Sequence, residues 1–245
     1  NYELGGFSDA EEGGQMPLPE GTFTIGKLLQ QAGYQTAVIG KWGLGMNHTS
    51  GEPLNQGFNY YYGYLDQKQA HNYYPTHLWE NGQWDSLNNP FIDVHKKLNP
   101  LTAHEKDFDY YKGREYAPAK ITEKAKAFIQ KNKSSSFFLY LPYTLPHLSL
   151  QAPDEWVRKY IGQFDEKIYY GEKGYAATKY PLATYAAMIS YLDAQVGEIL
   201  AQLQKLGIDD NTLVFFSSDN GATFTGGVDK EFFNSNGGLR GAKMD

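Results

Sequence analysis

Two oxygen-bearing side chains, Asp219 and Asn220, lie directly behind an apolar run of the chain. The run, Thr212–Phe216, is short, contains β-branched and aromatic residues, and is followed by two serines. This pattern predicts a strand buried on both faces of a sheet, with Asp219 and Asn220 just past its carboxyl end. Carboxylate and amide oxygens at that edge suit a Ca²⁺ or Mg²⁺ ion. An Asx turn that simply ends the strand is the alternative interpretation.

A lysine and a histidine follow two other apolar runs in a similar way. Lys41 comes just after the run 34–39 and is bracketed by glycines, whereas His147 follows the run 137–143 and is bracketed by prolines. Glycine lets a backbone approach an anion closely, and proline holds the neighbouring backbone in place. A solvated surface lysine and a hydrogen-bonded structural histidine are the alternatives.

The three runs are predicted to form parallel strands of one sheet, because helical pattern precedes each of them and crossovers are right-handed. Their carboxyl ends then share one edge, which brings Lys41, His147 and Asp219 together, and Arg240 and Lys243 follow closely enough to reach it. A pocket with a metal ion, cationic side chains and a proton-carrying imidazole is complementary to a tetrahedral oxyanion in its transition state. The residues therefore indicate hydrolysis of a sulfate or a phosphate ester and leave the choice open.

The elements that must position these residues are those of an α/β fold, with a mainly parallel central sheet flanked by helices. Helices are predicted over 25–32, with Thr22 or Thr24 as cap, over 118–131, and over 182–206. The last helix carries an apolar stripe that is expected to be core. The stripe consists of Tyr185, Ile189, Leu192, Val196, Ile199, Leu203 and Leu206.

Residues 51–116 form an aromatic, weakly periodic excursion. His71 and His77 lie in it as candidate substrate-binding residues, or equally as ordinary loop histidines, and their spacing of six does not predict a zinc site. Asn81-Gly82 is typical of a hairpin turn. A second polar segment, 154–181, is expected to be an insertion over the cleft.

Composition narrows the class of partner. The 245 residues carry a net charge of −6, which argues against nucleic acid, and they include no Cys, which excludes disulfides and thiolate metal sites here. No apolar run is long enough to span a membrane. Twenty Tyr, fourteen Phe and four Trp favour a sugar-handling cleft, although aromatics also fill cores. No signal peptide is visible at the first residues, and the chain is expected to be a segment of something longer.

Five motifs in order resemble the type I sulfatases, which belong to the alkaline-phosphatase-like superfamily. They are residues 33–45 (GYQTAVIGKWGLG), 57–63 (GFNYYYG), 137–147 (FFLYLPYTLPH), 218–221 (SDNG) and 240–243 (RGAK). The likeness extends over nearly the whole chain. Residues 67–79 are similar to bacterial members that act on sulfated sugars. The resemblance implies that residues 1–245 are the central portion of one sulfatase catalytic domain.

This resemblance implies roles for individual residues. Asp219 and Asn220 would bind the metal, usually Ca²⁺ and less often Mg²⁺. Lys41 and Lys243 would hold the sulfate oxygens of a sulfated sugar or aryl sulfate, and His147 with Lys243 would protonate the departing alcohol. A periplasmic or secreted location is a family expectation.

The sequence departs from the family pattern in two respects. The family nucleophile is a formylglycine hydrate made within a Cys/Ser-x-Pro/Ala-x-Arg signature, which is absent from these residues. The segment alone is therefore expected to be inactive. Gly43 stands where many members carry a histidine that helps to expel sulfate. Either His71 or His77 replaces it, or water suffices.

Two alternatives stay open. A phosphoester hydrolase of the same superfamily would be expected to hold two metals with extra Asp and His ligands, and few edge carboxylates are present here. A catalytically silent sugar-binding homologue would keep the aromatic cleft and lack the nucleophile.

Overall fold

The computed structural model describes residues 16–243, which divide into two compact units. The first unit contains residues 16–91, 113–144 and 195–210, and the second contains 92–112, 145–194 and 211–243. The predicted site residues are divided between them: Lys41, His71 and His77 belong to the first unit, and the others belong to the second.

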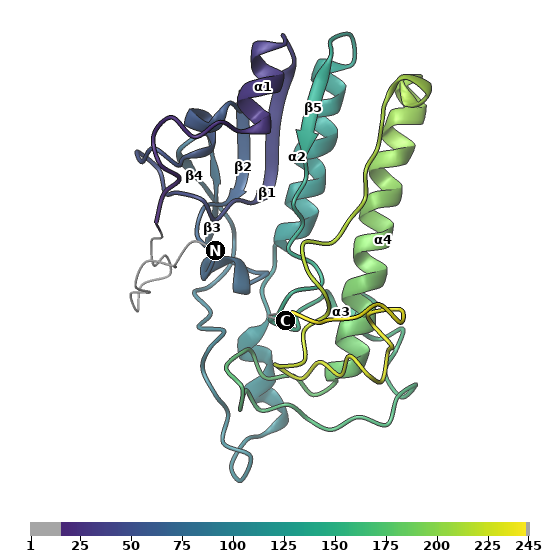
Figure 1. Ribbon diagram of the computed structural model, residues 1–245. Coiled ribbons are helices and arrows are strands. Elements are labelled where there is room, and N and C mark those ends of the chain that lie inside the picture. Colours follow the sequence, from purple (N-terminus) through teal and green to yellow (C-terminus); the bar gives the residue numbers. More distant parts are fainter. Residues whose placement is uncertain (1–15, 244–245) are drawn as a thin grey trace. The chain divides into compact units, whose positions relative to one another are not determined.

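The first unit is built on a five-stranded mixed sheet with the order β4-β3-β2-β1-β5 (Figure 1). The strands are β1 (Gln35–Lys41), β2 (Tyr60–Tyr64), β3 (His77–Glu80), β4 (Gln83–Ser86) and β5 (Phe137–Tyr140). β1 runs parallel to both β2 and β5, while the pairs β2–β3 and β3–β4 are antiparallel. The predicted parallel arrangement of the strands that precede Lys41 and His147 is therefore confirmed. β5 is shorter and more exposed than expected, since it ends at Tyr140, which is 49% exposed.

Four α-helices and four short 3₁₀ helices are described. The α-helices are α1 (Ile25–Gln31), α2 (Ala117–Asn132), α3 (Asp154–Val157) and α4 (Pro181–Leu206). The 3₁₀ helices are η1 (Pro53–Gln56), η2 (Gln69–His71), η3 (Glu105–Tyr111) and η4 (Asp209–Asn211). Thr24 caps α1 by accepting the N–H of Lys27 at 3.2 Å, and Gly33 follows the helix with φ +88°, as its sequence predicts. No helix within residues 16–243 has the length and apolarity needed to cross a membrane.

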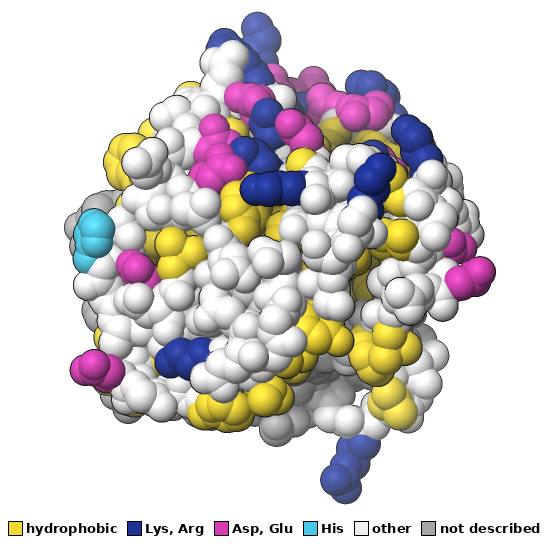
Figure 2. All heavy atoms as spheres, turned by 90° about the horizontal axis from the view of Figure 1, so that it is seen from above, with side chains coloured by type: hydrophobic (Ala, Val, Ile, Leu, Met, Phe, Trp, Pro, Cys, Tyr) yellow, Lys and Arg dark blue, Asp and Glu magenta, His cyan; other side chains and the backbone are white. Residues whose placement is uncertain are grey.

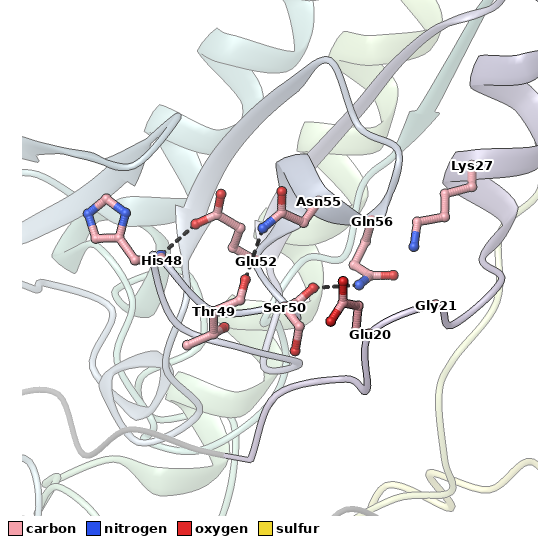
Figure 3. Close-up of a pocket in the computed structure, with 9 residues that line it drawn as sticks. All are labelled: Glu20, Gly21, Lys27, His48, Thr49, Ser50, Glu52, Asn55 and Gln56. Atoms are coloured by element: carbon pink, nitrogen blue, oxygen red, sulfur yellow. Dashed lines mark hydrogen bonds between the residues drawn. The ribbon is translucent and has the colours of Figure 1, made fainter.

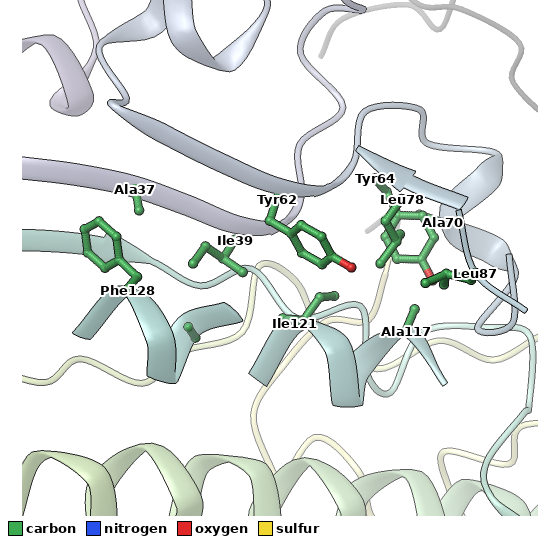
Figure 4. Packing of buried hydrophobic residues seen from close by; sticks show 11 residues of the cluster. Ala37, Ile39, Tyr62, Tyr64, Ala70, Leu78, Leu87, Ala117, Ile121 and Phe128 are labelled. Atoms are coloured by element: carbon green, nitrogen blue, oxygen red, sulfur yellow. The ribbon is translucent and has the colours of Figure 1, made fainter. Parts of the chain in front are cut away.

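The core of the first unit lies between the sheet and α2. Strand β1 is buried on both faces. Ile39 packs with Tyr62 and Ile121 on one face (Figure 4). Val38 belongs to a second cluster with Phe58. Each such side chain contributes about 1.5–3 kcal/mol through burial. The alternation fixes the strand's register, so that Lys41 is held at its carboxyl end.

A polar network ties one edge of this sheet to α2. The Tyr60 hydroxyl donates to Glu80 at 2.6 Å, and the Lys124 ammonium binds the same carboxylate at 2.7 Å. The Tyr62 hydroxyl donates to Asp85 at 2.7 Å, and Lys124 lies 4.8 Å above the Tyr62 ring. Burial raises the pKa of Glu80, but the hydrogen bonds from Lys124 and Tyr60 outweigh it and leave that pKa below its usual value.

The hairpin predicted at Asn81-Gly82 is present between β3 and β4. Asn81 has φ +48° and Gly82 has φ +84°, the two positive values that a type I′ turn requires. This turn places Trp84 opposite Trp79 in the register of the pair.

The prediction of a buried strand over Thr212–Phe216 is wrong. Residues 213–216 form no strand, and Leu213 and Phe215 are 80% and 85% exposed. An apolar run becomes a strand only when a neighbouring strand supplies hydrogen-bond partners, and none of the described strands pairs with it. Apolar side chains also reach the surface elsewhere, as Figure 2 shows for one face.

Helix α4 confirms the prediction for 182–206, but its stripe is only partly core. Leu203 and Tyr185 are 3% and 5% exposed, whereas Ile189 is 42% exposed. In the second unit, the first turns of α4 pack Ala183 and Ala187 against Val157 of α3. Residues 154–181, the expected insertion, contain α3 and an isolated antiparallel bridge.

Candidate functional site

The centre of the candidate site is a pair of side chains in the second unit, His147 and Lys243. The Lys243 Nζ lies 2.8 Å from His147 Nε2, and His147 Nδ1 lies 2.6 Å from the backbone oxygen of Leu148. A carbonyl oxygen can only accept, so Nδ1 carries the proton and Nε2 presents its lone pair to the Lys243 ammonium. The pair therefore holds one mobile proton between two nitrogen atoms.

Asp219 and Asn220 lie in an exposed turn of the same unit. The Ser218 hydroxyl donates to the backbone oxygen of Asn220 at 2.8 Å, which shapes the turn. Next to it, Gly221 comes so near Ala242 that an added Cβ would be 3.0 Å from the Ala242 Cα. The close approach brings the turn alongside the segment that carries Lys243.

One amide side chain, Asn236, joins these two segments. Its Oδ1 accepts the N–H of Ala222 at 2.9 Å, and its Nδ2 donates to the backbone oxygen of Gly241 at 2.6 Å. The N–H of Lys243 donates in turn to the backbone oxygen of Ala222 at 3.1 Å. Burial lowers the pKa of the Lys243 ammonium, and the negative charge of Asp219 opposes that shift.

The donor types of Asp219 and Asn220 suit a hard cation such as Ca²⁺, which takes six to eight oxygen ligands. Two side chains supply only part of such a set. Within residues 16–243 no three His, Asp or Glu side chains cluster closely enough to complete it. The oxygen atoms of Asp219 and Asn220 therefore fit a metal ion, but the two side chains make up only part of its ligand set. Arg240, which the sequence analysis places at the site as a cationic side chain, is exposed and lies three residues before Lys243.

Two residues that the sequence analysis did not single out extend the surroundings of His147. The ring of Tyr175 is edge-on to the His147 ring, and the ring of His95 contacts that of Tyr175. Neither residue belongs to a recognisable motif. Only the tertiary structure of the second unit brings them there, so no signal in the sequence could have found them.

Lys41 is the last residue of β1 and is half-buried, as its place in the sequence predicts. Its N–H donates to the backbone oxygen of Pro142 at 2.9 Å. The preceding Gly40 is required here, because a Cβ would lie 2.2 Å from that same oxygen. Lys41 belongs to the first unit, so its meeting with His147 and Lys243 around one anion stays a prediction.

His71 and His77 have different surroundings. His77 is 2% exposed, its ring stacks on Trp84 at 4.0 Å, and its backbone oxygen accepts from Gln69 Nε2 at 3.0 Å. These contacts favour a structural role for His77. His71 ends η2 and is half-buried, and its role at the substrate stays a prediction.

The backbone at Gly43 disfavours the histidine that the family resemblance would lead one to expect there. Its φ is +75°, and an added Cβ would lie 2.8 Å from Nε2 of Gln67. The side chain of Gln67 thus occupies the space into which a residue at position 43 would point.

A polar hollow of about 640 Å³ is present elsewhere in the first unit (Figure 3). It is lined by Glu20, Gly21, Lys27, His48, Thr49, Ser50, Glu52, Asn55 and Gln56. Several of these side chains hold nearby backbone: Asn55 Nδ2 donates to Thr49, and Gln56 Nε2 donates to Ser50. None of the predicted site residues lines the hollow.

Comparison with known proteins gives concordant matches. A family model described as Sulfatase matches residues 2–244. The arylsulfatase of Klebsiella aerogenes is 26% identical over 263 residues, covering 86% of this chain and 50% of that protein. The N-acetylgalactosamine-6-sulfatase of Mus musculus is 29% identical over 209 residues, covering 84% and 34%. The crystal structure of Ps i-CgsB in complex with k-i-k-neocarrahexaose has a TM-score of 0.63 at 26% identity, covering 89% and 44%. The chain therefore spans about a third to a half of the length of these relatives.

Proposed function

Because the chain belongs to the sulfatase family, we propose that the full-length protein hydrolyses sulfate esters of carbohydrates or aryl alcohols. The observation that carries the proposal is the contact between Lys243 Nζ and His147 Nε2, at 2.8 Å. This pair lies near the turn that carries Asp219 and Asn220. It can supply a proton to the leaving oxygen and positive charge to the sulfate when the S–O bond of the ester breaks.

The proposed step follows from the balance of charge. As the S–O bond breaks, its electron pair goes to the leaving oxygen, which needs a proton because an alkoxide is a poor leaving group. The His147–Lys243 pair gives that proton, and the hydrogen bond of Nδ1 to Leu148 keeps Nε2 aimed at its partner. Lys41 and Lys243 attract the sulfate oxygens through their positive charge.

Asp219 and Asn220 are proposed as ligands of Ca²⁺, which would stabilise negative charge on the sulfate. The oxygen chemistry of the two residues supports this assignment. The nucleophile is proposed to be the formylglycine of the family, formed on a residue other than the 245 of this sequence, which contains no Cys and no matching serine signature.

Relatives suggest the substrate class. The mouse relative is named as a sulfatase of N-acetylgalactosamine 6-sulfate, and the Ps i-CgsB structure contains a neocarrahexaose. The aromatic-rich composition, with 20 Tyr and 14 Phe, agrees with a substrate that is a sugar. A sulfated saccharide is therefore the proposed natural substrate.

The test is sulfate release by the full-length protein from sulfated galactosides and from 4-nitrophenyl sulfate, with and without a chelator. We expect release that the chelator abolishes and added Ca²⁺ restores. Cleavage of 4-nitrophenyl phosphate in preference to the sulfate would favour a phosphoester hydrolase instead. Binding of the sulfated sugar with no release from any ester would favour a silent sugar-binding protein.

A further inference from the structure

Two further rings are linked by contacts to the imidazole of the His147–Lys243 pair. The centroids of His95 and Tyr175 are 5.7 Å apart with the rings tilted by 47°, and those of Tyr175 and His147 are 6.2 Å apart with the rings at 74°. His147 contacts Lys243 through its Nε2. Tyr175 thus contacts the imidazole whose Nε2 faces the Lys243 ammonium.

The backbone that carries Tyr175 is held in a closed turn. Tyr169 and Thr178 exchange two backbone hydrogen bonds of 3.0 and 2.9 Å, which form an isolated antiparallel bridge. Between them, the N–H of Gly174 donates to the backbone oxygen of Gly171 at 3.0 Å, and both glycines have positive φ. Tyr175 is therefore presented from a short loop closed at its base.

Two further contacts hold this loop against the site. His95 Nδ1 donates to the backbone oxygen of Gly174 at 2.7 Å, and the N–H of Ala176 donates to the Ser149 hydroxyl at 3.3 Å. One bond lies on each side of Tyr175, and Ser149 is only two residues beyond His147. The loop and the segment carrying His147 consequently keep a fixed spacing.

The location of Tyr175 has a chemical meaning if the pair protonates a leaving oxygen. That oxygen must come within about 2.6–3.2 Å of the donor nitrogen, so the carbon skeleton attached to it comes within reach of the Tyr175 ring. Tyr175 is half-buried, which leaves part of its side chain accessible. An aromatic ring in this place offers an apolar face with a polar tip, the combination that suits a sugar.

We propose that Tyr175 binds the alcohol portion of the sulfate ester and sets the preference for a sugar over a small aryl group, with His95 holding its loop through Gly174. This inference rests on the proposed sulfatase function and extends it to the leaving-group side of the site. The competing role for Tyr175 is to hold the His147 ring in place without touching the substrate.

The experiment compares wild-type full-length protein with Tyr175→Ala, Tyr175→Phe and a control, Tyr34→Ala, an exposed tyrosine of the first unit. Steady-state kinetics are measured on a sulfated galactoside and on 4-nitrophenyl sulfate, and binding of the galactoside is measured by calorimetry. Loss of the ring is expected to raise KM for the galactoside about tenfold, with kcat little changed. Tenfold corresponds to about 1.4 kcal/mol, near the upper end of what an aromatic contact contributes. Tyr175→Phe should recover most of the binding, and Tyr34→Ala should match wild type.

The outcomes separate the two proposals. A fall in kcat with unchanged KM would mean that Tyr175 only positions His147, and equal KM values in wild type and Tyr175→Ala would also overturn the inference. Failure of the wild type to release sulfate from any ester would overturn the proposed function alone. In that case the calorimetric Kd for the galactoside tests the role of Tyr175. A roughly tenfold larger Kd in Tyr175→Ala supports substrate binding by Tyr175, and an unchanged Kd overturns it.

Discussion

Lys243 Nζ and His147 Nε2 lie 2.8 Å apart although the residues are 96 positions apart in the sequence. The imidazole is oriented by its own bond to Leu148, and Lys243 is held by the backbone bond to Ala222. Each member of the pair is thus fixed independently of the other, so the spacing between them is a property of the second unit.

The first prediction concerns the dependence on the leaving group. His147→Gln and Lys243→Met should each lower kcat about 10²–10⁴-fold on a sulfated sugar in the full-length protein. For His147→Gln the loss on 4-nitrophenyl sulfate should be much smaller, because nitrophenolate leaves without a proton. Lys243→Met should lose activity on both substrates, because it also removes a charge that attracts the sulfate oxygens. Steady-state kinetics on both substrates measure the difference.

The double variant of these two residues gives a further check. Because they act as one proton-donating unit, the combined loss should be little larger than that of Lys243→Met alone. Lys205→Met, an exposed lysine in the last turn of α4, serves as the control and should match wild type. Equal losses of His147→Gln on the two substrates would contradict proton donation by the pair.

The second prediction concerns the metal. Ca²⁺ at about 100 times its Kd should stabilise the full-length protein by about 2.7 kcal/mol, because only the folded state binds it. Asp219→Ala should remove most of that stabilisation, whereas Asp210→Ala, at an exposed aspartate in η4, should keep it. Thermal unfolding with and without Ca²⁺ measures both, and an unchanged response in Asp219→Ala would exclude Asp219 as a ligand.

The third prediction concerns pH and Glu80. Its pKa is lowered below the usual value near 4.5, so the folded state holds the carboxylate more strongly than the unfolded state does. The resulting stability is complete above the unfolded pKa and is lost as pH falls through the folded pKa. Glu80→Gln should therefore destabilise the protein at pH 7, and the difference from wild type should shrink as the pH falls below about 4.5.

The expected size of this effect is small. Glu80 has a side chain that is 37% exposed, so solvent screening keeps the loss to about 0.5–1 kcal/mol. Urea unfolding of both proteins between pH 3.5 and 7 is the measurement. A difference that grew as the pH fell would show that the Lys124 and Tyr60 bonds do not favour the carboxylate.

The secondary structure of the first unit was predictable where local signals agree. The structure contains the helix α1 that is predicted from the cap at Thr24 and the glycine at position 33. It also contains α2, which is predicted from the spacing of its apolar residues. The strand expected at 212–216 failed for a physical reason. Its apolar residues satisfy every local rule, but pairing with another strand is a tertiary event that no local pattern can supply.

The candidate site was predictable to a similar extent. Asp219 and Lys243 come together through contacts within some 25 residues. His147 contacts Lys243 as predicted, although the strand expected to bring Asp219 to a shared sheet edge is not formed. Tyr175 and His95 were missed because they lie in loops without a motif, and their positions depend on backbone bonds to Ser149 and Gly174.

The fourth prediction concerns the position of the missing family histidine. Gly43→Ala should destabilise the protein by about 1–2 kcal/mol, because φ of +75° strains any residue with a Cβ, although the flexible end of Gln67 can move aside. Gly197→Ala is the matched control. It lies in α4 with no atom near its added Cβ, so the substitution should stabilise by about 0.5–1 kcal/mol. Chemical denaturation of the two variants checks the opposite signs.

Asn236, whose side chain makes two hydrogen bonds that join the segments of the site, is also open to deamidation. Its amide is followed by Gly237, and an asparagine before glycine loses ammonia more readily than most because the small neighbour does not shield it. The aspartate so formed would turn a donor to Gly241 into a carboxylate oxygen that repels it. Deamidation of this one residue is far too slow to matter within one turnover. Over long storage it would weaken the hydrogen bonds that hold the segment of Lys243 and the turn of Asp219 together, and so would limit how long the site keeps its structure.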